Sequence, residues 1–507
     1  MASRLRVVLC WHMHQPEYRD GLTGEELLPW VALHAIKDYV DMVAHLEAVP
    51  AARAVVNFSP VLLEQIEATA TGLSSHLSAG TRLASPLLRL LTPGGVPRDR
   101  GEWSELVRAC LRAHRQHLVE RHPAYRELAD EAGRRLHGGT VSTLGEGFIV
   151  DLAVWYHLAW LGETVRRADP RVAEFEARGQ GFTAADCRRV LELVSELLSG
   201  VLPRYRRLAE QGRLELAMSP WMHPIVPLLL DFQSVRESLP GAPLPGPVSY
   251  PDGAVRARRH LEEGRSIFRR LLGVEPRGCW PSEGAVSTGC VELLAECGFE
   301  WAASGEGVLR ASLERSGRVP VVERLNRGWR AGAGGVPCFF RSDHLSDLIG
   351  FNYAHWHGDD AVRDLVHQLE RLADELAHAP QSVVSIILDG ENAWEHYPFN
   401  GYYFLRGLYE ALAAHPRLEL ATFHDVVSAG GVADELPVLV AGSWVHGTLA
   451  TWIGDPDKNA GWDRLVQAKL VADEVLADAT LPAAHRTAIE RQLALCESSD
   501  WFWWFGD

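Results

Sequence analysis

The chain has 507 residues, of which 47% are apolar and 23% charged, so it can bury a large core without disulfides or metals. Its 50 Lys and Arg against 66 Asp and Glu give a net charge of −16, which disfavours nucleic acid and anionic membranes as partners and favours a neutral substrate. No run of about 18 apolar residues occurs, so the sequence predicts no membrane-spanning helix.

The cysteines and the N-terminus indicate a cytoplasmic protein. Eight cysteines are scattered without a Cys-x-x-Cys pair, which is typical of free buried thiols in a reducing compartment. The first residues lack the long apolar core and the cleavage site of a signal peptide. There is no convincing Gly-rich phosphate loop and no Gly-x-Ser-x-Gly segment, so we expect neither a cofactor nor a serine nucleophile.

Short apolar runs that end in polar clusters recur along the chain. There are eight of them: Leu5–Trp11, Ala52–Phe58, Leu214–Met218, Gly278–Trp280, Phe299–Ala303, Val336–Phe340, Val383–Leu388 and Leu418–Phe423. Such nearly continuous apolar runs are typical of strands buried on both faces. Helical patterns lie between them, at Trp30–Leu46, Ala254–Leu272, Asp359–Leu376 and Gly401–Ala414. Strands that alternate with helices, with polar residues at the strand ends, predict an α/β fold with a parallel barrel.

Two regions depart from this alternation. Residues 71–211 are helical in pattern, and we interpret them as an insertion that begins at the break Thr71–Ser75. Residues 431–507 predict a C-terminal helical domain on a barrel domain of residues 1–430, with helices at Trp462–Ala477 and Pro482–Cys496. The aromatic tail Trp501–Asp507 is unusual for a terminus, so it either docks into the core or continues in the native chain.

Two acidic residues follow predicted strands directly. Glu283 comes after Gly278–Trp280, and Asp389 comes after Val383–Leu388. Each alone also fits an acid that caps a helix or a turn. Together they fit glycoside hydrolysis, in which one carboxylate attacks the anomeric carbon while the other protonates the leaving oxygen. For a retaining mechanism we expect their carboxyl groups about 5–5.5 Å apart.

Histidines and aromatic residues surround these positions. His12 and His14 alternate along a strand and share a face, which suits a metal, sugar hydroxyls or plain core packing, and His223 has the same ambiguity. Arg341 and Asp343 fit either a substrate contact or a structural ion pair. Seventeen tryptophans are about twice what an average protein has, and many adjoin polar clusters, as expected of walls that stack on sugar rings.

Five segments in this order resemble glycoside hydrolase family 57: His14–Pro16, Trp221–Pro224, Trp280–Glu283, Asp389–Asn392, and Gly442–Trp444 with Thr451–Gly454 and Lys458–Asn459. The resemblance covers nearly the whole chain, and Asp151–Trp160 looks most like the amylopullulanase and α-amylase branch. One segment departs from the family, because Ser304–Glu306 reads Ser-Gly-Glu where Thr-Asp-Glu is expected. The aromatic tail looks like a family segment that continues further.

The resemblance implies a distorted (β/α)7 barrel with a helical domain. It implies hydrolysis of α-glucans with retention, at α-1,4 bonds and with α-1,6 bonds as a further candidate. It implies Glu283 as nucleophile and Asp389 as general acid/base, whose pKa the charges of Glu283 and Glu391 would raise. Trp221, Trp280 and Trp394 would stack on the glucan. The expected substrate-binding residues are His12, His14, Trp221, His223, Trp280, Arg341, Asp343, Glu391, Trp394 and Trp444, with no metal.

Other interpretations stay open at this point. A 4-α-glucanotransferase or a branching enzyme would use the same residues, since the outcome depends on how water is excluded from the acceptor subsites. A metal-dependent hydrolase would use His12, His14 and His223 with a late Asp. A carbohydrate-binding protein without activity is a third possibility, against which the two intact carboxylates argue. The segment around Trp444 should pack over the barrel rim and lend an aromatic side chain to the cleft.

Overall fold

The computed structural model describes residues 4–332, 334–432 and 434–506. The first three residues of the segment examined for a signal peptide, and Asp507 of the aromatic tail, lie outside the described residues. Within the described part, no helix is both long enough and apolar enough to cross a bilayer.

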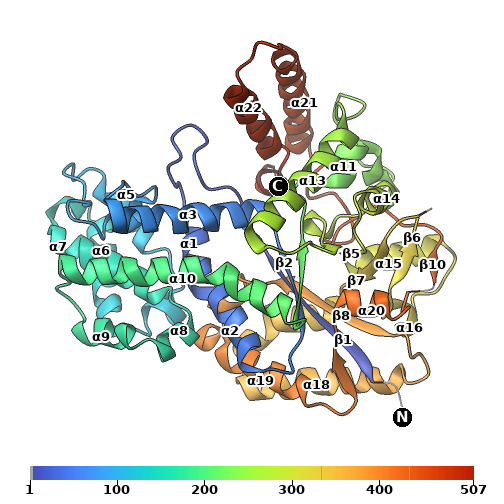
Figure 1. The fold of residues 1–507 in the computed structure, drawn as a ribbon, viewed down its shortest axis with the longest axis horizontal. Helices are drawn as coiled ribbons and strands as arrows, with labels where there is room; N and C mark the ends of the chain where they lie inside the picture. The colour runs from blue at the N-terminus through green and yellow to red at the C-terminus, as the bar shows by residue number, and fades with distance from the viewer. Residues whose placement is uncertain (1–3, 333, 433, 507) are drawn as a thin grey trace.

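One sheet of ten strands forms the centre of the molecule (Figure 1). The strands are β1 (Leu5–Met13), β2 (Ala54–Phe58), β3 (Leu214–Met218), β4 (Gly278–Cys279), β5 (Trp301–Ser304), β6 (Trp329–Ala331), β7 (Pro337–Phe340), β8 (Val383–Asp389), β9 (Leu418–Leu420) and β10 (Glu435–Leu436). Their order is β10-β6-β7-β5-β4-β3-β2-β1-β8, with β9 beside β1, and every pair is parallel except β6 with β7.

The strands β7-β5-β4-β3-β2-β1-β8 curl into the predicted seven-stranded barrel. The two ends of this row meet where Arg341 forms a parallel bridge with Ser385 in β8. The guanidinium Nε of Arg341 also donates to the carbonyl of Ile387 at 2.8 Å. All eight apolar runs overlap strands, because these residues are buried on both faces of the sheet. The antiparallel strand β6 and the two-residue strand β10 were not predicted.

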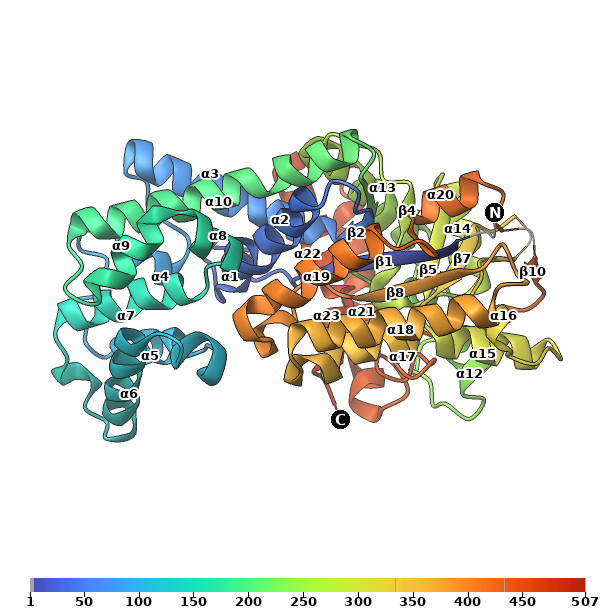
Figure 2. The ribbon, with the colours of Figure 1, turned by 90° about the horizontal axis from the view of Figure 1, so that it is seen from below.

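The helices cover the outside of this sheet and build a second lobe, which is formed by the segment between β2 and β3 (Figures 1 and 2). The helices of the barrel domain outside this lobe are α1 (Trp30–His34), α2 (Val40–Ala48), α11 (Val226–Leu230), α12 (Val235–Ser238), α13 (Gly253–Leu272), α14 (Thr288–Glu296), α15 (Glu306–Arg315), α16 (Val322–Leu325), α17 (Asp343–Asp347), α18 (Gly358–Glu375), α19 (Tyr402–Ala413) and α20 (Phe423–Ser428). A π-helical turn, η1 (Ala35–Tyr39), joins α1 to α2, so the single helix predicted at Trp30–Leu46 has three parts.

Between β2 and β3 the described chain forms helices joined by turns and loops, and no strand. Its helices are α3 (Pro60–Ala79), α4 (Pro86–Arg89), α5 (Trp103–Cys110), α6 (Pro123–His137), α7 (Glu146–Ala159), α8 (Glu163–Ala168), α9 (Pro170–Arg178) and α10 (Ala184–Glu210). The break expected at Thr71–Ser75 is wrong, because α3 continues through it. Gly72 is tolerated in the helix interior, and the chain leaves the helix only at Gly80, in the left-handed conformation that glycine allows (φ 71°).

The C-terminal region contains α21 (Pro456–Leu476), α22 (Ala483–Cys496) and α23 (Ser499–Trp503). It is not purely helical, because β10 pairs with β6 and extends the barrel sheet beyond residue 430. The helices α21 and α22 project from the barrel as a hairpin (Figure 1), and the chain then returns to the protein at α23. Phe502 of the aromatic tail is 1% exposed and stacks on Trp462, so this part of the tail docks into the core.

Candidate active site

A cleft of about 580 Å³ lies at the carboxyl ends of the central strands. Its lining comes from five parts of the chain: the barrel strand ends with the segments that follow them, helix α1, the insertion, the Trp444 segment and the tail. The lining residues are His12, His14, Gln15, Pro16, Tyr18, Trp30, His34, Arg112, Ala113, His114, Trp160, Glu283, Asp389, Asn392, Glu395, Trp444, Asp500, Trp503 and Trp504. Both predicted catalytic carboxylates therefore face one cavity.

Glu283 follows β4 in a short 3-10 turn, Ser282–Gly284, with a left-handed backbone (φ 58°). This conformation is costly for a residue with a side chain, and surrounding contacts must hold it. Trp444 provides two of them: its backbone N–H donates to the carbonyl of Glu283 at 3.2 Å, and its indole Nε1 donates to the carboxylate Oε2 at 3.0 Å. The predicted contribution of Trp444 to the cleft is thus present, and it includes a direct bond to Glu283.

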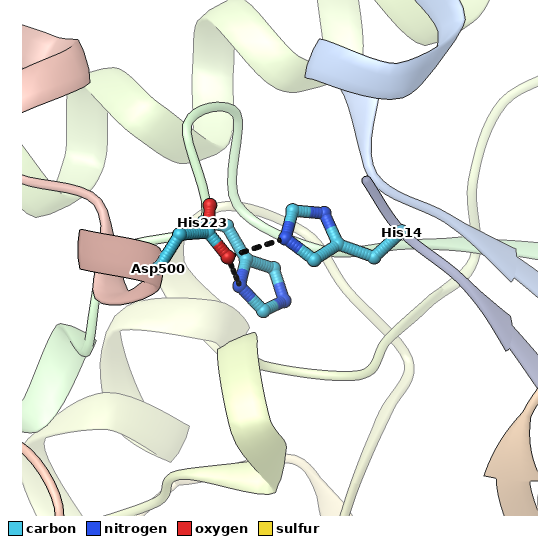
Figure 3. Close-up of side chains that lie close together, drawn as sticks. All are labelled: His14, His223 and Asp500. Atoms are coloured by element: carbon cyan, nitrogen blue, oxygen red, sulfur yellow. Dashed lines mark hydrogen bonds and ion pairs between the residues drawn. The ribbon is translucent and has the colours of Figure 1, made fainter. Parts of the chain in front are cut away.

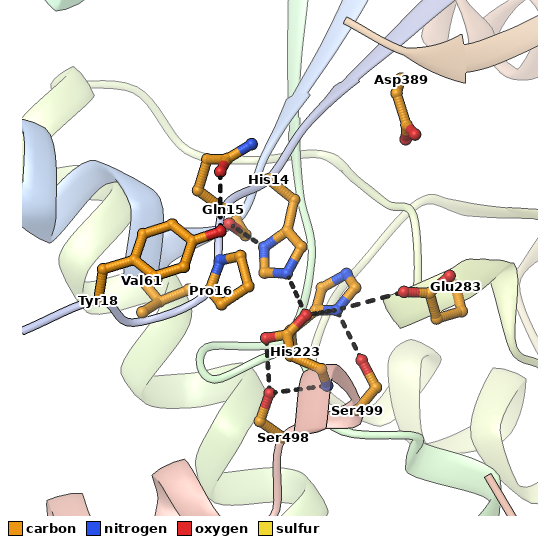
Figure 4. A network of polar contacts seen from close by, with 12 residues as sticks. His14, Gln15, Pro16, Tyr18, Val61, His223, Glu283, Asp389, Ser498 and Ser499 are labelled. Carbon is orange, nitrogen blue, oxygen red and sulfur yellow. Dashed lines mark hydrogen bonds and ion pairs between the residues drawn. The ribbon is translucent and has the colours of Figure 1, made fainter. Parts of the chain in front are cut away.

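Asp389 is the last residue of β8 and pairs in register with His12 of β1. Its Oδ2 accepts a hydrogen bond from the side-chain amide of Asn392 at 2.7 Å. Glu283 lines the same cleft, and Figure 4 shows both carboxylates on the same side of His14 and His223.

Both carboxyl groups have raised pKa values. Burial raises the pKa of Glu283 to about 7, and the charges of Asp389 and Asp500 add to this, while the Trp444 hydrogen bond opposes it. Burial also raises the pKa of Asp389, against the hydrogen bond from Asn392 and the charges of His14 and Arg341. The expected causes, the charges of Glu283 and Glu391, are replaced by burial. Because the pKa of Glu283 is about 7, this carboxyl group is partly protonated near neutral pH.

His12, His14 and His223 form a stack of rings in the site. Figure 3 shows two of them, His14 and His223, with Asp500. The rings of His14 and His223 lie 3.7 Å apart, and His12 lies 5.5 Å from His223. The Nε2 of His14 is hydrogen-bonded to the Oδ1 of Asp500 at 2.9 Å, and the Nδ1 of His223 lies 3.9 Å from the Oε1 of Glu283. His223 is fully buried and, like Glu283, has a left-handed backbone (φ 58°).

Among the three histidines of this stack, His14 alone has a raised pKa. Burial lowers the pKa of His12 to about 3 and that of His223 well below its usual value. Burial alone would also lower the pKa of His14, but the charge and hydrogen bond of Asp500, with Glu283 and Asp389, outweigh it and the pKa is raised. His14 and Asp500 therefore form a hydrogen-bonded pair that holds two polar groups at fixed positions in the cleft.

A metal site here would use His14, His223 and Asp500, whose donor atoms lie within 4.8 Å of one another. Imidazole nitrogens bind a metal in the plane of the ring. The two rings are stacked with only 16° between their planes, so their lone pairs run side by side and do not converge on one point. Their geometry suits hydrogen bonds to hydroxyl groups better than coordination of one ion.

Three tryptophans expected to stack on the substrate do not line the cleft. Trp280 and Trp394 have no exposed surface, and Trp221 is 5% exposed with its indole N–H bonded to Glu64. Their side chains pack beneath the strand ends, where large apolar groups are buried most completely. The stacking prediction is wrong for these three. The tryptophans in the lining are instead Trp30, Trp160, Trp444, Trp503 and Trp504.

Three predicted polar contacts support the cleft from outside. Glu391 is 1% exposed and accepts from the backbone N–H of His14, so the prediction that it binds substrate is wrong. Arg341 pairs with Asp343 at 2.8 Å, beside the barrel closure and outside the cleft lining. For these two the alternative of a structural ion pair is the one observed.

The unexpected glycine of Ser304–Glu306 has a steric reason. A Cβ on Gly305 would lie 2.5 Å from the Cα of Trp444, so no larger residue fits at this position. Gly307 makes a similar close approach, with a Cβ position 3.0 Å from the Cα of Gly447. The departure from the family pattern thus permits the backbone of the Trp444 segment to lie directly on β5 and α15.

Sequence reasoning missed several residues of the cleft. Asp500 lies beside the aromatic tail, which was noticed, but nothing in the pattern links it to His14, 486 positions earlier. Arg112 and His114 come from the insertion, and their position depends on how that lobe packs. Asn57 and Ser59, hydrogen-bonded to His12 and His14, could have been found, because they end the second predicted strand.

Comparisons with known proteins agree with the arrangement of the fold. The model of glycosyl hydrolase family 57 matches residues 8–437. The branching enzyme of the same family from Pyrococcus horikoshii is similar at 15% identity and a TM-score of 0.60, over 99% of this chain and 85% of that one. The α-amylase AmyC from Thermotoga maritima is similar at 15% identity and a TM-score of 0.57, over 98% and 88%. The 4-α-glucanotransferase from Thermococcus litoralis is similar at 15% identity and a TM-score of 0.51, over 97% of this chain and 55% of that one. The chain belongs to glycosyl hydrolase family 57.

Proposed function

We propose that this protein cleaves α-glucosidic bonds of α-glucans by double displacement with retention of configuration. The observation that carries the proposal is the pair Glu283 and Asp389, two buried carboxyl groups with raised pKa values in one cleft. Solved family members that share the fold are described as a branching enzyme, an α-amylase and a 4-α-glucanotransferase, which supports an α-glucan substrate. The cleft volume of about 580 Å³ is within the usual range for ligand sites.

The reaction begins with one proton on Asp389 and a negative charge on Glu283. The Glu283 carboxylate attacks the anomeric carbon while Asp389 gives its proton to the departing oxygen, which yields a glycosyl ester and a shortened glucan. Asp389, now ionised, takes a proton from water or from an acceptor hydroxyl, whose oxygen displaces Glu283. The indole N–H of Trp444 favours the ionised nucleophile. The separation of about 5–5.5 Å that retention requires stays a prediction.

The His14–Asp500 pair, which lines the cleft, would hold hydroxyl groups of the attacked ring. His223 is fully buried, so it would act from behind, where its ring stacks on His14 and its Nδ1 lies 3.9 Å from the Glu283 carboxylate. Binding energy used in this way raises the rate only if these contacts strengthen toward the transition state.

Transfer to a second glucan is the other candidate function. The lining tryptophans Trp30, Trp160, Trp503 and Trp504 give the cleft apolar walls, which favour a sugar acceptor over water. Hydrolysis and transfer use the same carboxylates and differ only in what displaces Glu283.

Product analysis distinguishes these possibilities. We expect maltoheptaose to be converted, and chromatography of the products separates shorter chains alone (hydrolysis) from both shorter and longer chains (transfer). Pullulan tests α-1,6 cleavage, and amylose tests the formation of branch points. Absence of any turnover of these glucans by pure wild-type protein would contradict the proposed function.

Replacing Trp444 tests its bond to Glu283. Trp444→Phe keeps a ring but removes the N–H that stabilises the carboxylate, so the pKa of Glu283 should rise above about 7. A hydrogen bond to a charged group contributes about 1.5 kcal/mol or more, which corresponds to about one pKa unit. The acid limb of kcat/KM for maltoheptaose, which follows the ionisation of the nucleophile Glu283, should move to higher pH by about that amount. Trp444→Ala should in addition raise KM several-fold, more for long glucans than for short ones.

A matched control for this test is Trp462→Phe. Trp462 is also buried in the C-terminal region and donates its indole N–H to the carbonyl of Trp452, away from the carboxylates. Trp462→Phe should lower the stability of the protein without moving the pH profile of kcat/KM. If Trp444→Phe behaves in the same way, the Trp444 segment is only a structural support.

A further inference from the structure

Glu497 is a buried carboxylate that the proposed reaction does not use. It follows α22 directly, is 1% exposed and accepts four hydrogen bonds from elements of the barrel. Tyr250 donates at 2.6 Å, Arg256 donates twice, at 2.7 and 2.8 Å, and the Nε2 of His260 lies at 2.7 Å. Burial alone would raise the pKa of Glu497, but His260 and Arg256 lower it to about 2, so this group is ionised and firmly held.

The three residues after Glu497 each contact the candidate active site (Figure 4). The hydroxyl of Ser498 donates to the Oδ2 of Asp500 at 2.7 Å, and Asp500 is bonded to His14. The backbone N–H of Ser499 donates to the carbonyl of His223 at 2.9 Å, and its hydroxyl is hydrogen-bonded to the Nδ1 of the same histidine, also at 2.9 Å. One anchored residue therefore fixes the position of a whole set of cleft contacts.

These contacts fall on a strained part of the backbone. His223 is left-handed at φ 58°, a conformation that persists only where its neighbours impose it. Glu283 has the same conformation, and its carbonyl likewise accepts from a backbone N–H of the C-terminal region, that of Trp444. The C-terminal region thus holds both strained residues of the cleft through their carbonyl groups.

We propose that Glu497, held by Arg256, His260 and Tyr250, is a positioning residue that sets the place of His223 and Asp500 in the active site. It touches no reacting atom and acts through the segment Ser498–Asp500. The inference rests on the proposed function, because its test measures glucan cleavage.

The first test compares two glutamates that bind the same arginine. Glu497→Gln keeps the shape of the side chain but weakens the bonds to Arg256 and His260. Glu490→Gln is the control, because Glu490 pairs with Arg256 at 2.8 Å and with Arg259 at 3.0 Å but contacts no residue of the cleft. We expect Glu497→Gln to lower kcat on maltoheptaose at least tenfold with a smaller change in KM. Glu490→Gln should keep wild-type kcat.

The second test leaves the anchor intact and removes one backbone donor. Ser499 is the first residue of α23, where proline is tolerated, and Ser498 before it has φ −59° and ψ 145°, which suits a residue that precedes proline. Ser499→Pro removes both the N–H and the hydroxyl that reach His223, whereas Ser499→Ala removes the hydroxyl alone. The proline variant should lose several-fold more kcat than the alanine variant at a comparable melting temperature.

The outcomes separate this inference from the proposed function. Wild-type protein without activity on any glucan would refute the proposed function, and with it the inference. Active wild-type protein, with kcat unchanged in folded Glu497→Gln and equal in the two Ser499 variants, would overturn the inference alone. A loss of kcat in Glu490→Gln as large as in Glu497→Gln would also overturn it, because the effect would then follow stability and not position.

Discussion

Glu283→Gln should lower turnover of maltoheptaose by about 10⁴-fold or more, as loss of a catalytic nucleophile does in other enzymes. The amide matches the carboxylate in shape and still accepts the N–H of Trp444, so the fold and glucan binding should persist. It cannot form the glycosyl ester on which double displacement depends. Steady-state kinetics with calorimetric measurement of glucan affinity would check both parts of this expectation.

A second carboxylate one strand further along provides the control. Glu306 follows β5 but pairs with Arg310 and lies outside the cleft lining. Glu306→Gln should keep near wild-type rates. Retained activity in Glu283→Gln together with its loss in Glu306→Gln would transfer the nucleophile to Glu306.

Asp389→Asn should slow cleavage of maltoheptaose by about 10²–10⁴-fold, the usual contribution of a general acid. With α-maltosyl fluoride the formation of the glycosyl ester should keep its rate in this variant, because fluoride leaves without a proton. The variant should therefore release a rapid burst of fluoride and then stall, since no base activates water against the glycosyl ester. Added azide, which needs no base, should restore turnover and give α-maltosyl azide. A β-azide would instead indicate that Asp389 is the nucleophile.

The pH dependence of that burst has a definite direction. The charge of Asp389 contributes to raising the pKa of Glu283 to about 7, so its removal should lower this pKa. In Asp389→Asn the rate of the fluoride burst should rise as the pH increases through the lowered pKa of Glu283. At higher pH the rate should stay constant. The wild-type profile for maltoheptaose should rise as the pH increases through about 7, where the nucleophile Glu283 becomes ionised. An unchanged midpoint in Asp389→Asn would mean that the two carboxyl groups do not interact.

The barrel could be predicted because parallel strands that are buried on both faces appear in the sequence as continuous apolar runs. Val383–Leu388 and Leu214–Met218 are continuous apolar runs, and both are strands with almost the same bounds. β6 and β10 have no such apolar run, since they are three and two residues long and lie at the edge of the sheet. The continuation of α3 past Gly72 could not be predicted from the sequence. A glycine inside a helix lowers its stability only slightly, and packing of the rest of the helix offsets this loss.

The candidate site was predictable where it depends on strand ends and not where it depends on packing. Glu283, Asp389, His12 and His14 end or follow buried strands, so topology alone brings them to one cleft. The tryptophans next to them in sequence failed as predictors, because Trp221, Trp280 and Trp394 follow the strands in turns and loops, and the apolar pattern does not fix the direction of side chains there. Trp280 thus lies in the core while Glu283, three residues later, faces the cavity.

The bond between His14 and Asp500 has a consequence for how the protein folds, because it joins residues 486 positions apart. Contacts of such sequence separation form late, after the loop between them has been organised by nearer contacts. During refolding the barrel tryptophans, such as Trp301, should therefore reach their native fluorescence before glucan cleavage returns. The delay measures the time that the segment after α22 takes to find its place against an already assembled barrel.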